Sequence, residues 1–175
     1  MADFARDPRL CDIARSFLGP AAFPFRATLF DKSGQSNWLV VWHQDTALPL
    51  REKHETRGWG PWSVKDGIHY AHAPANTLEQ IVAIRVHLDD STTDNGPLRV
   101  LPGTHNRGLL TDDEIHQLSL EIEPDECHIE LGGLVLMCPL IVHASSKAKS
   151  HQSRRVLHIE YAAHASFDGL TLVVA

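Results

Sequence analysis

The chain has 175 residues, of which 43% are hydrophobic and 22% are charged, and this composition predicts one globular domain with a single core. The formal net charge is -6 at pH 7 and there is no run of Lys or Arg, which argues against a nucleic-acid partner. No stretch approaches the roughly 18 consecutive apolar residues that a membrane-spanning helix requires, so we expect no membrane partner.

The cysteines indicate the cellular compartment in which the protein is expected. Cys11, Cys127 and Cys138 are odd in number, show no CxxC spacing and follow no secretory leader. This pattern is typical of reduced thiols rather than of a disulfide framework. We therefore expect a cytoplasmic protein.

The first third of the chain predicts one helix and two strands. Residues 3–18 show the spacing of an amphipathic helix. Residues 25–30 and the apolar, aromatic run 38–42 are strand candidates. The second strand places His43 at its end, with Asp45 on the same face if the strand continues, because strand side chains alternate.

Residues 46–79 show little periodicity and contain several Gly and Pro residues, together with Trp59 and Trp62. An irregular segment of this length in a small domain is often a lid or binding loop, so we expect it to enclose the substrate. The two tryptophans either line a substrate pocket or anchor the segment by packing, and the sequence leaves both alternatives open.

The remainder predicts mostly short strands. Strand candidates at 81–88 and 98–101 flank a turn at 94–97, and a helix at 111–119 begins with Thr111 as the N-cap of a capping box. Further strand candidates are 127–131, 133–137, 141–144 and 155–162. Many short strands separated by turns favour an antiparallel sandwich or barrel.

One group of residues indicates metal chemistry. His43 and Asp45 are followed one hundred residues later by His143. Two imidazoles and one carboxylate are the ligand set of the facial-triad iron(II) oxygenases, which leave other coordination positions open for small ligands. The chain holds twelve histidines, so spacing alone does not identify the site, and His158 with Glu160 forms a competing His-x-acid pair.

Two further residues would suit an oxo acid bound to such a metal. An oxo acid that chelates the metal directs a second carboxylate deeper, and that anion is costly to bury unpaired. Arg154 follows His143 by 11 residues, and its guanidinium can bind a carboxylate bidentately. Ser145 would face the same side as His143, whereas Arg155 competes with Arg154 because successive strand residues point in opposite directions.

Three segments in this order resemble the phytanoyl-CoA dioxygenase family, part of the iron(II) and 2-oxoglutarate dependent oxygenases. They are Trp42-His43-Gln44-Asp45, the run from Asp94-Asn95-Gly96-Pro97 to Pro102-Gly103-Thr104-His105, and His143-Ala144-Ser145 with Arg154. The resemblance covers roughly residues 23–165. It implies a mainly β fold, a cupin-like double-stranded β-helix or jelly roll with a few peripheral helices.

The resemblance also implies residue roles. The catalytic iron(II) ligands would be His43, Asp45 and His143, and the cosubstrate 2-oxoglutarate would be bound by Arg154, Ser145 and Arg85. The family offset selects Arg154 over Arg155. With dioxygen, such an enzyme hydroxylates a small organic substrate and releases succinate and carbon dioxide. Halogenase relatives carry a small residue in place of the metal carboxylate, so the presence of Asp45 favours hydroxylation.

Relatives usually carry a longer N-terminal portion, so we expect residues 1–175 to form a single dioxygenase domain with a shortened N-terminal region. A compact variant, a homodimer that completes its core across an interface, and a form with reduced activity all stay open. Two other functions also stay open. One is a cupin-like metal enzyme, such as an isomerase, without 2-oxoglutarate, and the other is a non-catalytic scaffold that binds metal or ligand.

Overall fold

The computed structural model describes residues 2–33 and 36–174. Its strands are β1 (Phe23–Lys32), β2 (Val40–His43), β3 (Ala47–Leu50), β4 (Trp62–Lys65), β5 (Ile68–His72), β6 (Ile81–His87), β7 (Leu98–Val100), β8 (Asp125–Cys127), β9 (Leu134–Met137), β10 (His143–Ser145), β11 (Arg154–Ala162), β12 (Ser166–Phe167) and β13 (Leu170–Thr171). The helices are α1 (Ala2–Ala5), α2 (Pro8–Leu18), α3 (Ala75–Leu78) and α4 (Asp112–Glu121), with 3-10 turns η1 (Thr93–Asn95) and η2 (Thr104–Arg107). No helix in these described ranges is long and apolar enough to cross a membrane.

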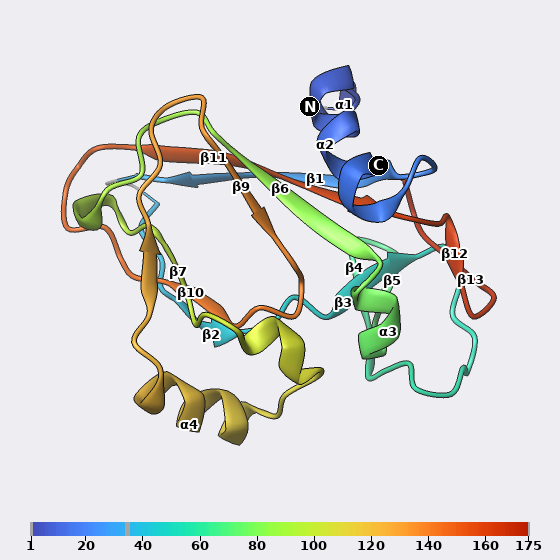
Figure 1. Ribbon diagram of the computed structural model, residues 1–175. Coiled ribbons are helices and arrows are strands. Elements are labelled where there is room, and N and C mark those ends of the chain that lie inside the picture. The colour runs from blue at the N-terminus through green and yellow to red at the C-terminus, as the bar shows by residue number, and fades with distance from the viewer. Residues whose placement is uncertain (1, 34–35, 175) are drawn as a thin grey trace.

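Two antiparallel sheets face each other. The major sheet has the strand order β1-β11-β6-β9 and the minor sheet has the order β2-β10-β7-β8. The chain leaves the major sheet after β6, forms β7 and β8, returns for β9, crosses to β10 and returns again for β11 (Figure 1). This alternation is a double-stranded β-helix, so the predicted jelly-roll fold is confirmed.

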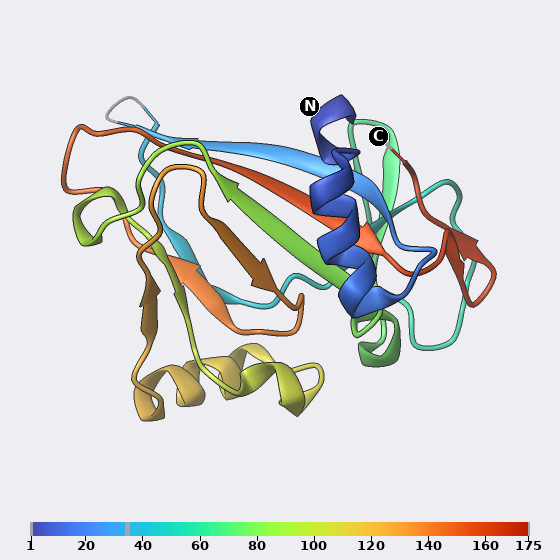
Figure 2. The same cartoon turned by 45° about the horizontal axis from the view of Figure 1, so that its top comes forward.

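The central strands β6 and β11 are almost entirely buried on both faces. Alternation divides their side chains into two sets. The outward set is apolar and packs beneath α2, which crosses the outer face of the major sheet (Figure 2). The inward set is buried and includes five polar side chains: Arg85, His87, Arg154, His158 and Glu160. The space between the sheets therefore holds buried charged groups beside apolar ones.

The predicted N-terminal helix is confirmed as two helices with a break at Arg6 and Asp7. The break has a local cause, because the Asp7 carboxylate accepts a hydrogen bond from the Arg9 backbone N–H and caps α2, with Pro8 in the first turn. The helix ends at Leu18, and Gly19 follows with φ of 93°. The helix predicted at 111–119 is confirmed as α4, with Thr111 in a capping box.

The predicted strands mostly overlap the observed ones, with one exception. We expected a strand at 127–131, but β8 covers Asp125–Cys127 and ends where that prediction begins. Beyond it, Ile129 forms an isolated bridge to Ser91 and the chain turns at Gly132, with φ of 82°. The prediction of an extended strand was wrong because the apolar Ile129 lies in the connection between β8 and β9, where it forms only an isolated bridge.

The prediction of an irregular segment at 46–79 was also wrong. This segment forms a small sheet with the order β3-β5-β4, followed by α3. Strands β4 and β5 are joined at Asp66 and Gly67, which have φ of 50° and 77°. Positive φ at both positions is the backbone of a tight hairpin turn, for which Asp-Gly is a preferred sequence. The strands are too short for their periodicity to stand out.

The two tryptophans of this segment anchor it by packing. Trp59 is buried and its indole N–H donates to the Asp168 carboxylate at 3.0 Å. Trp62 is partly buried and packs against the same apolar cluster, which includes Leu48, Leu50 and Leu170. The alternative of anchoring is therefore the one that the structure favours.

The turn at Asn95-Gly96-Pro97 is structural, as predicted. Gly96 has φ of 69°, and a Cβ at this position would lie 2.4 Å from the carbonyl oxygen of Ser146. Asn95 is buried, and its side chain accepts from the backbone of Thr92 and donates to the carbonyl of Asp90. Glycine is required here because both the backbone angle and the close approach exclude a side chain.

Candidate metal centre

Strand pairing brings the two predicted histidine ligands together. His43 ends β2 and His143 begins β10, and the two residues are direct partners in the antiparallel register. Their ring centroids lie 4.2 Å apart. Asp45 follows in the connection to β3, and its backbone N–H donates to the carbonyl of Pro139 at 2.9 Å. Two residues that are one hundred positions apart in the sequence are thus brought together by one pair of neighbouring strands.

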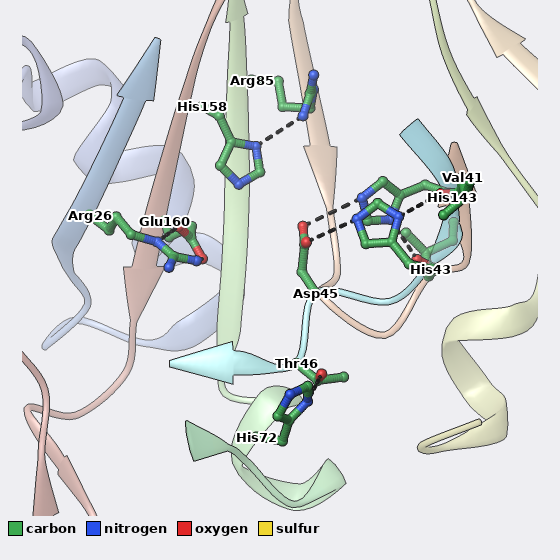
Figure 3. Close-up of polar contacts among 11 residues, drawn as sticks. Arg26, Val41, His43, Asp45, Thr46, His72, Arg85, His143, His158 and Glu160 are labelled. Carbon is green, nitrogen blue, oxygen red and sulfur yellow. Dashed lines mark hydrogen bonds and ion pairs between the residues drawn. The ribbon is translucent and has the colours of Figure 1, made fainter. Parts of the chain in front are cut away.

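The three side chains converge on a common point (Figure 3). One carboxylate oxygen of Asp45 lies 3.4 Å from Nε2 of His43, and the other lies 3.5 Å from Nε2 of His143. One ligand atom from each residue lies within 4.8 Å of the others, and no second group of this kind occurs among the residues described. This is the donor set of the predicted metal site.

Gln44 positions the two predicted ligands that flank it. Its amide nitrogen donates to the carbonyls of Leu140 at 2.7 Å and Gly108 at 2.9 Å, and its amide oxygen accepts from the N–H of Leu110 at 2.9 Å. These bonds hold the end of β2 against the loops beside β10 and α4. This role was not predicted from the sequence, although alternation places Gln44 on the opposite face from His43 and Asp45.

Both imidazoles are held in one tautomer. Nδ1 of His43 lies 2.8 Å from the carbonyl oxygen of Val41, and Nδ1 of His143 lies 2.9 Å from that of Ile141. A carbonyl only accepts, so Nδ1 donates in both rings, and Nε2 is the nitrogen that faces Asp45 and is left for a metal. Outer hydrogen bonds of this type orient the histidine ligands of metal sites.

The ionisation states also suit a cation. Burial raises the pKa of Asp45, but the hydrogen bond with His43 lowers it, and the net effect holds the pKa well below its ordinary value. The Asp45 hydrogen bond raises the pKa of His43, whereas burial lowers that of His143. An anionic oxygen and two imidazole nitrogens match the facial-triad ligand set for non-haem iron(II).

A cavity of about 140 Å³ extends from this centre between the two sheets. All six residues predicted from the sequence line it, so Arg85, Ser145 and Arg154 share one space with His43, Asp45 and His143. The other lining residues are Phe30, Lys32, Trp38, Val40, Leu98, Ala144 and His158.

Lys32 is a charged residue of this cavity that the sequence analysis missed. Its side chain is 0% exposed, and Nζ donates to Oγ of Ser145 at 2.7 Å and to the carbonyl of Ser146 at 2.6 Å. Burial and the charges of Arg154 and Arg85 lower the pKa of Lys32 to about 8. Extending the predicted strand 25–30 by two residues would have placed Lys32 on the same face as Phe30.

The two arginines present unpaired donors to the interior. Arg154 is buried and its guanidinium contacts Ser145 Oγ at 3.4 Å and the Asn95 carbonyl at 3.3 Å, but Nη1 has no partner among the described residues. Arg85 contacts Nδ1 of His158 at 3.1 Å, and its Nε is likewise unpartnered within that part of the chain. Burial and Arg154 lower the pKa of Arg85 to about 10.

Three buried cations around one cavity fit an anionic ligand. An unpaired buried donor costs about 1–3 kcal/mol, and a charged one costs more. A bound carboxylate would pair the orphaned Arg N–H groups and offset the repulsion among the cations. Arg155, the competitor of Arg154, is exposed and forms an ion pair with Asp89 at 2.8 Å. Arg154, and not Arg155, therefore points into the cavity.

The competing pair His158 and Glu160 does not belong to the metal donor set, although His158 lines the same cavity. The guanidinium of Arg26 binds Glu160 through two hydrogen bonds, one of them at 2.6 Å. Burial and Arg85 lower the pKa of His158 to about 3, so the ring is neutral in the cavity wall. These residues support the site from the side of the major sheet.

A double-stranded β-helix with a His-Asp-His group at one end of its cavity and buried cations at the other is typical of the non-haem oxygenases. The family described as Phytanoyl-CoA dioxygenase (PhyH) matches residues 1–156. The chain belongs to this family.

Individual relatives agree with the family. The chain is 29% identical to an L-proline trans-4-hydroxylase of Streptomyces griseoviridis, over 91% of this chain and 62% of that protein. It is 32% identical to an ectoine dioxygenase of Sphingopyxis alaskensis, over 72% of this chain and 37% of that protein. A crystal structure of EctD from S. alaskensis with 2-oxoglutarate and 5-hydroxyectoine shares the fold, with a TM-score of 0.66 at 21% identity, over 93% of this chain and 51% of that one. The chain thus spans less than two thirds of the length of these proteins.

Proposed function

We propose that this chain is an iron(II) and 2-oxoglutarate dependent dioxygenase that hydroxylates a small organic substrate. The observation that carries the proposal is one cavity with the His43, Asp45 and His143 donor set at one end and buried, unpaired arginine N–H groups at the other. Family membership and the 2-oxoglutarate complex of EctD support it.

His43, Asp45 and His143 would hold the iron. When bound, the metal supplies the activation of dioxygen that couples oxidation of 2-oxoglutarate to oxidation of the substrate. In the overall reaction, one oxygen atom of dioxygen enters a substrate C–H bond to give an alcohol, and the other enters succinate as carbon dioxide leaves.

The chain's own residues bind and orient the reactants. Arg154, Ser145 and Lys32 would bind the far carboxylate of 2-oxoglutarate, and Arg85 would add positive charge between this end and Asp45. Phe30, Trp38 and Leu98 give the cavity apolar walls that restrict water. The paired Nδ1 atoms of His43 and His143 keep both Nε2 lone pairs directed at the metal position.

We propose that residues 1–175 act as one domain, with dioxygen and a small-molecule substrate as partners. The free state of the three cysteines supports a cytoplasmic location. A homodimer stays a prediction, to be tested by the mass of the protein in solution.

The test is an anaerobic titration of the purified protein with iron(II) and 2-oxoglutarate. We expect a visible metal-to-ligand charge-transfer band that needs both additions, and succinate release once oxygen is admitted. The Arg154→Ala variant should lose the band at 2-oxoglutarate concentrations that saturate the wild type.

Each alternative has its own outcome. A metal-dependent activity that Arg154→Ala leaves unchanged would favour a cupin-like enzyme without 2-oxoglutarate. A charge-transfer band with no succinate, even with candidate substrates present, would favour a non-catalytic scaffold.

A further inference from the structure

A second cavity lies beside the metal centre. It has a volume of about 290 Å³, and we call it the lateral groove. His43 and Asp45 line both this groove and the cavity between the sheets. A molecule in the lateral groove would therefore lie next to the metal ligands without entering the space of Lys32, Arg85 and Arg154. The remaining lining residues are Arg26, Gln44, Thr46, Ala47, Lys65, Tyr70 and His72.

The groove is built by the small sheet that the sequence analysis expected to be irregular. Lys65 ends β4, and Tyr70 and His72 lie on β5. The hydroxyl of Thr46 lies 2.6 Å from Nδ1 of His72. In the view of Figure 3, Asp45 lies between the Arg85 and His158 pair above and the Thr46 and His72 pair below. The hairpin β4–β5 thus brings polar side chains to the side of Asp45 away from the buried arginines.

Two cations flank a single aromatic ring in this groove. Lys65 Nζ lies 5.4 Å from the centroid of the Tyr70 ring, and Arg26 Cζ lies 6.0 Å from it. Glu160 binds Nε and Nη2 of Arg26, so Nη1 lies outside that pair. Lys65 takes part in no ion pair among the described residues. A divalent cation on Asp45 would cancel the one remaining negative charge of the groove.

We infer that the lateral groove binds the substrate and that Lys65, with Arg26 and the Tyr70 hydroxyl, recognises a carboxylate on it. The inference rests on the proposed function, which requires an organic molecule beside the metal. Uncompensated positive charge at the groove selects an anion, and the small sheet fixes the backbone from which the exposed Lys65 extends. The substrate class is a small organic carboxylate, with the carbon to be hydroxylated nearer to Asp45 than the carboxylate is.

The test compares acids with their neutral amides. Binding of L-proline, L-valine and cyclopentanecarboxylate, each beside its primary amide, is measured by anaerobic calorimetry on the protein loaded with iron(II) and 2-oxoglutarate. We expect at least one acid to bind tenfold or more tightly than its amide, and to stimulate succinate release in air.

Matched variants assign the preference to the groove. Lys65→Met should weaken binding of that acid about tenfold, and Lys65→Glu should weaken it further, while the amide is unaffected. Lys53→Met is the control, because Lys53 is also partly exposed and lies 5.8 Å from the ring centroid of Trp62, but does not line the groove. Lys53→Met should bind the acid as the wild type does.

The outcomes separate this inference from the proposed function. The iron and 2-oxoglutarate band should be the same in Lys65→Met and the wild type, since Lys65 does not line the inner cavity. A protein that shows the band but binds no acid more tightly than its amide overturns the inference alone, as does an equal effect of the two lysine substitutions. A wild type without the band overturns the proposed function, and the acid preference is then measured with the metal alone.

Discussion

The two ends of the inner cavity are stabilised in opposite ways. At the metal end, each ligand has a partner within the chain, since His43 and His143 donate to carbonyls and Asp45 contacts both rings. At the cationic end, Lys32, Arg85 and Arg154 lie buried together, and two of their N–H groups have no partner in the described ranges. The metal end is preorganised by the protein, whereas the cationic end is completed only by an anion.

The largest effect is expected at the preorganised end. Asp45→Ala removes the anionic donor and leaves two neutral nitrogens, so iron binding and succinate formation should fall by more than about 100-fold, beyond the range seen for outer partners of metal ligands. Iron(II) affinity and turnover measure this. Asp113→Ala is the control, because Asp113 is an exposed aspartate of α4 that does not line the inner cavity, and it should leave iron affinity unchanged. A variant Asp45→Ala with normal iron affinity would remove Asp45 from the metal site.

The next effect is at the cationic end. Arg154→Ala should weaken 2-oxoglutarate binding about 100-fold, because loss of one partner from a buried charged pair costs about 2–5 kcal/mol. Unfolding of the ligand-free protein should change little, since removal of one of three buried cations also relieves repulsion. Arg155→Ala is the matched control and should alter binding by less than about twofold, because its ion pair with Asp89 is exposed. Equal weakening of 2-oxoglutarate binding by Arg154→Ala and Arg155→Ala would contradict the role of Arg154 at the cationic end.

Thermal unfolding can separate the two ends directly. At 100 times its Kd, 2-oxoglutarate should stabilise the iron-loaded protein by about 2.7 kcal/mol, or roughly 5–10 °C in Tm for a domain of this size. In Arg154→Ala, the rise in Tm caused by iron should persist, whereas the rise in Tm caused by 2-oxoglutarate should disappear. If 2-oxoglutarate still raises the Tm of this variant, the anion binds elsewhere.

The smallest effect is a dependence on pH from Lys32. Its pKa is lowered to about 8, so the lysine loses its proton as the pH rises through that value. Affinity for 2-oxoglutarate should then fall by up to about tenfold per pH unit above 8. The stability of the ligand-free protein should change in the other direction, since between pH 8 and 10.5 the folded state binds fewer protons than the unfolded one, and this group contributes increasing stability as pH rises.

Calorimetric titration of 2-oxoglutarate from pH 6.5 to 9.5 measures this dependence. Lys32→Met should bind more weakly at pH 7 and show a flatter profile, whereas Lys53→Met should keep the wild-type profile. A flat profile for the wild type would show that Lys32 does not contact the anion.

Local rules predicted the part of the site at the end of one strand. Alternation at the end of β2 placed His43 and Asp45 together, and the capping box at Thr111 placed the start of α4. Ligand chemistry and spacing added His143, Ser145 and Arg154, the family resemblance selected Arg154 over Arg155 and added Arg85, and all four of the added residues line the inner cavity. The Asp66-Gly67 hairpin was also visible in the sequence as a turn signal, but its short strands hid it.

By itself, the sequence determined a mainly β chain, the residue types for a metal donor set and the strand end that carries two of its members. Only the tertiary structure decided which strands become neighbours. The register that pairs His43 with His143, and the facing of the two sheets that buries Lys32 beside Arg154, depend on packing between segments about one hundred residues apart. No local pattern specifies such pairings, because register follows from which faces are buried together.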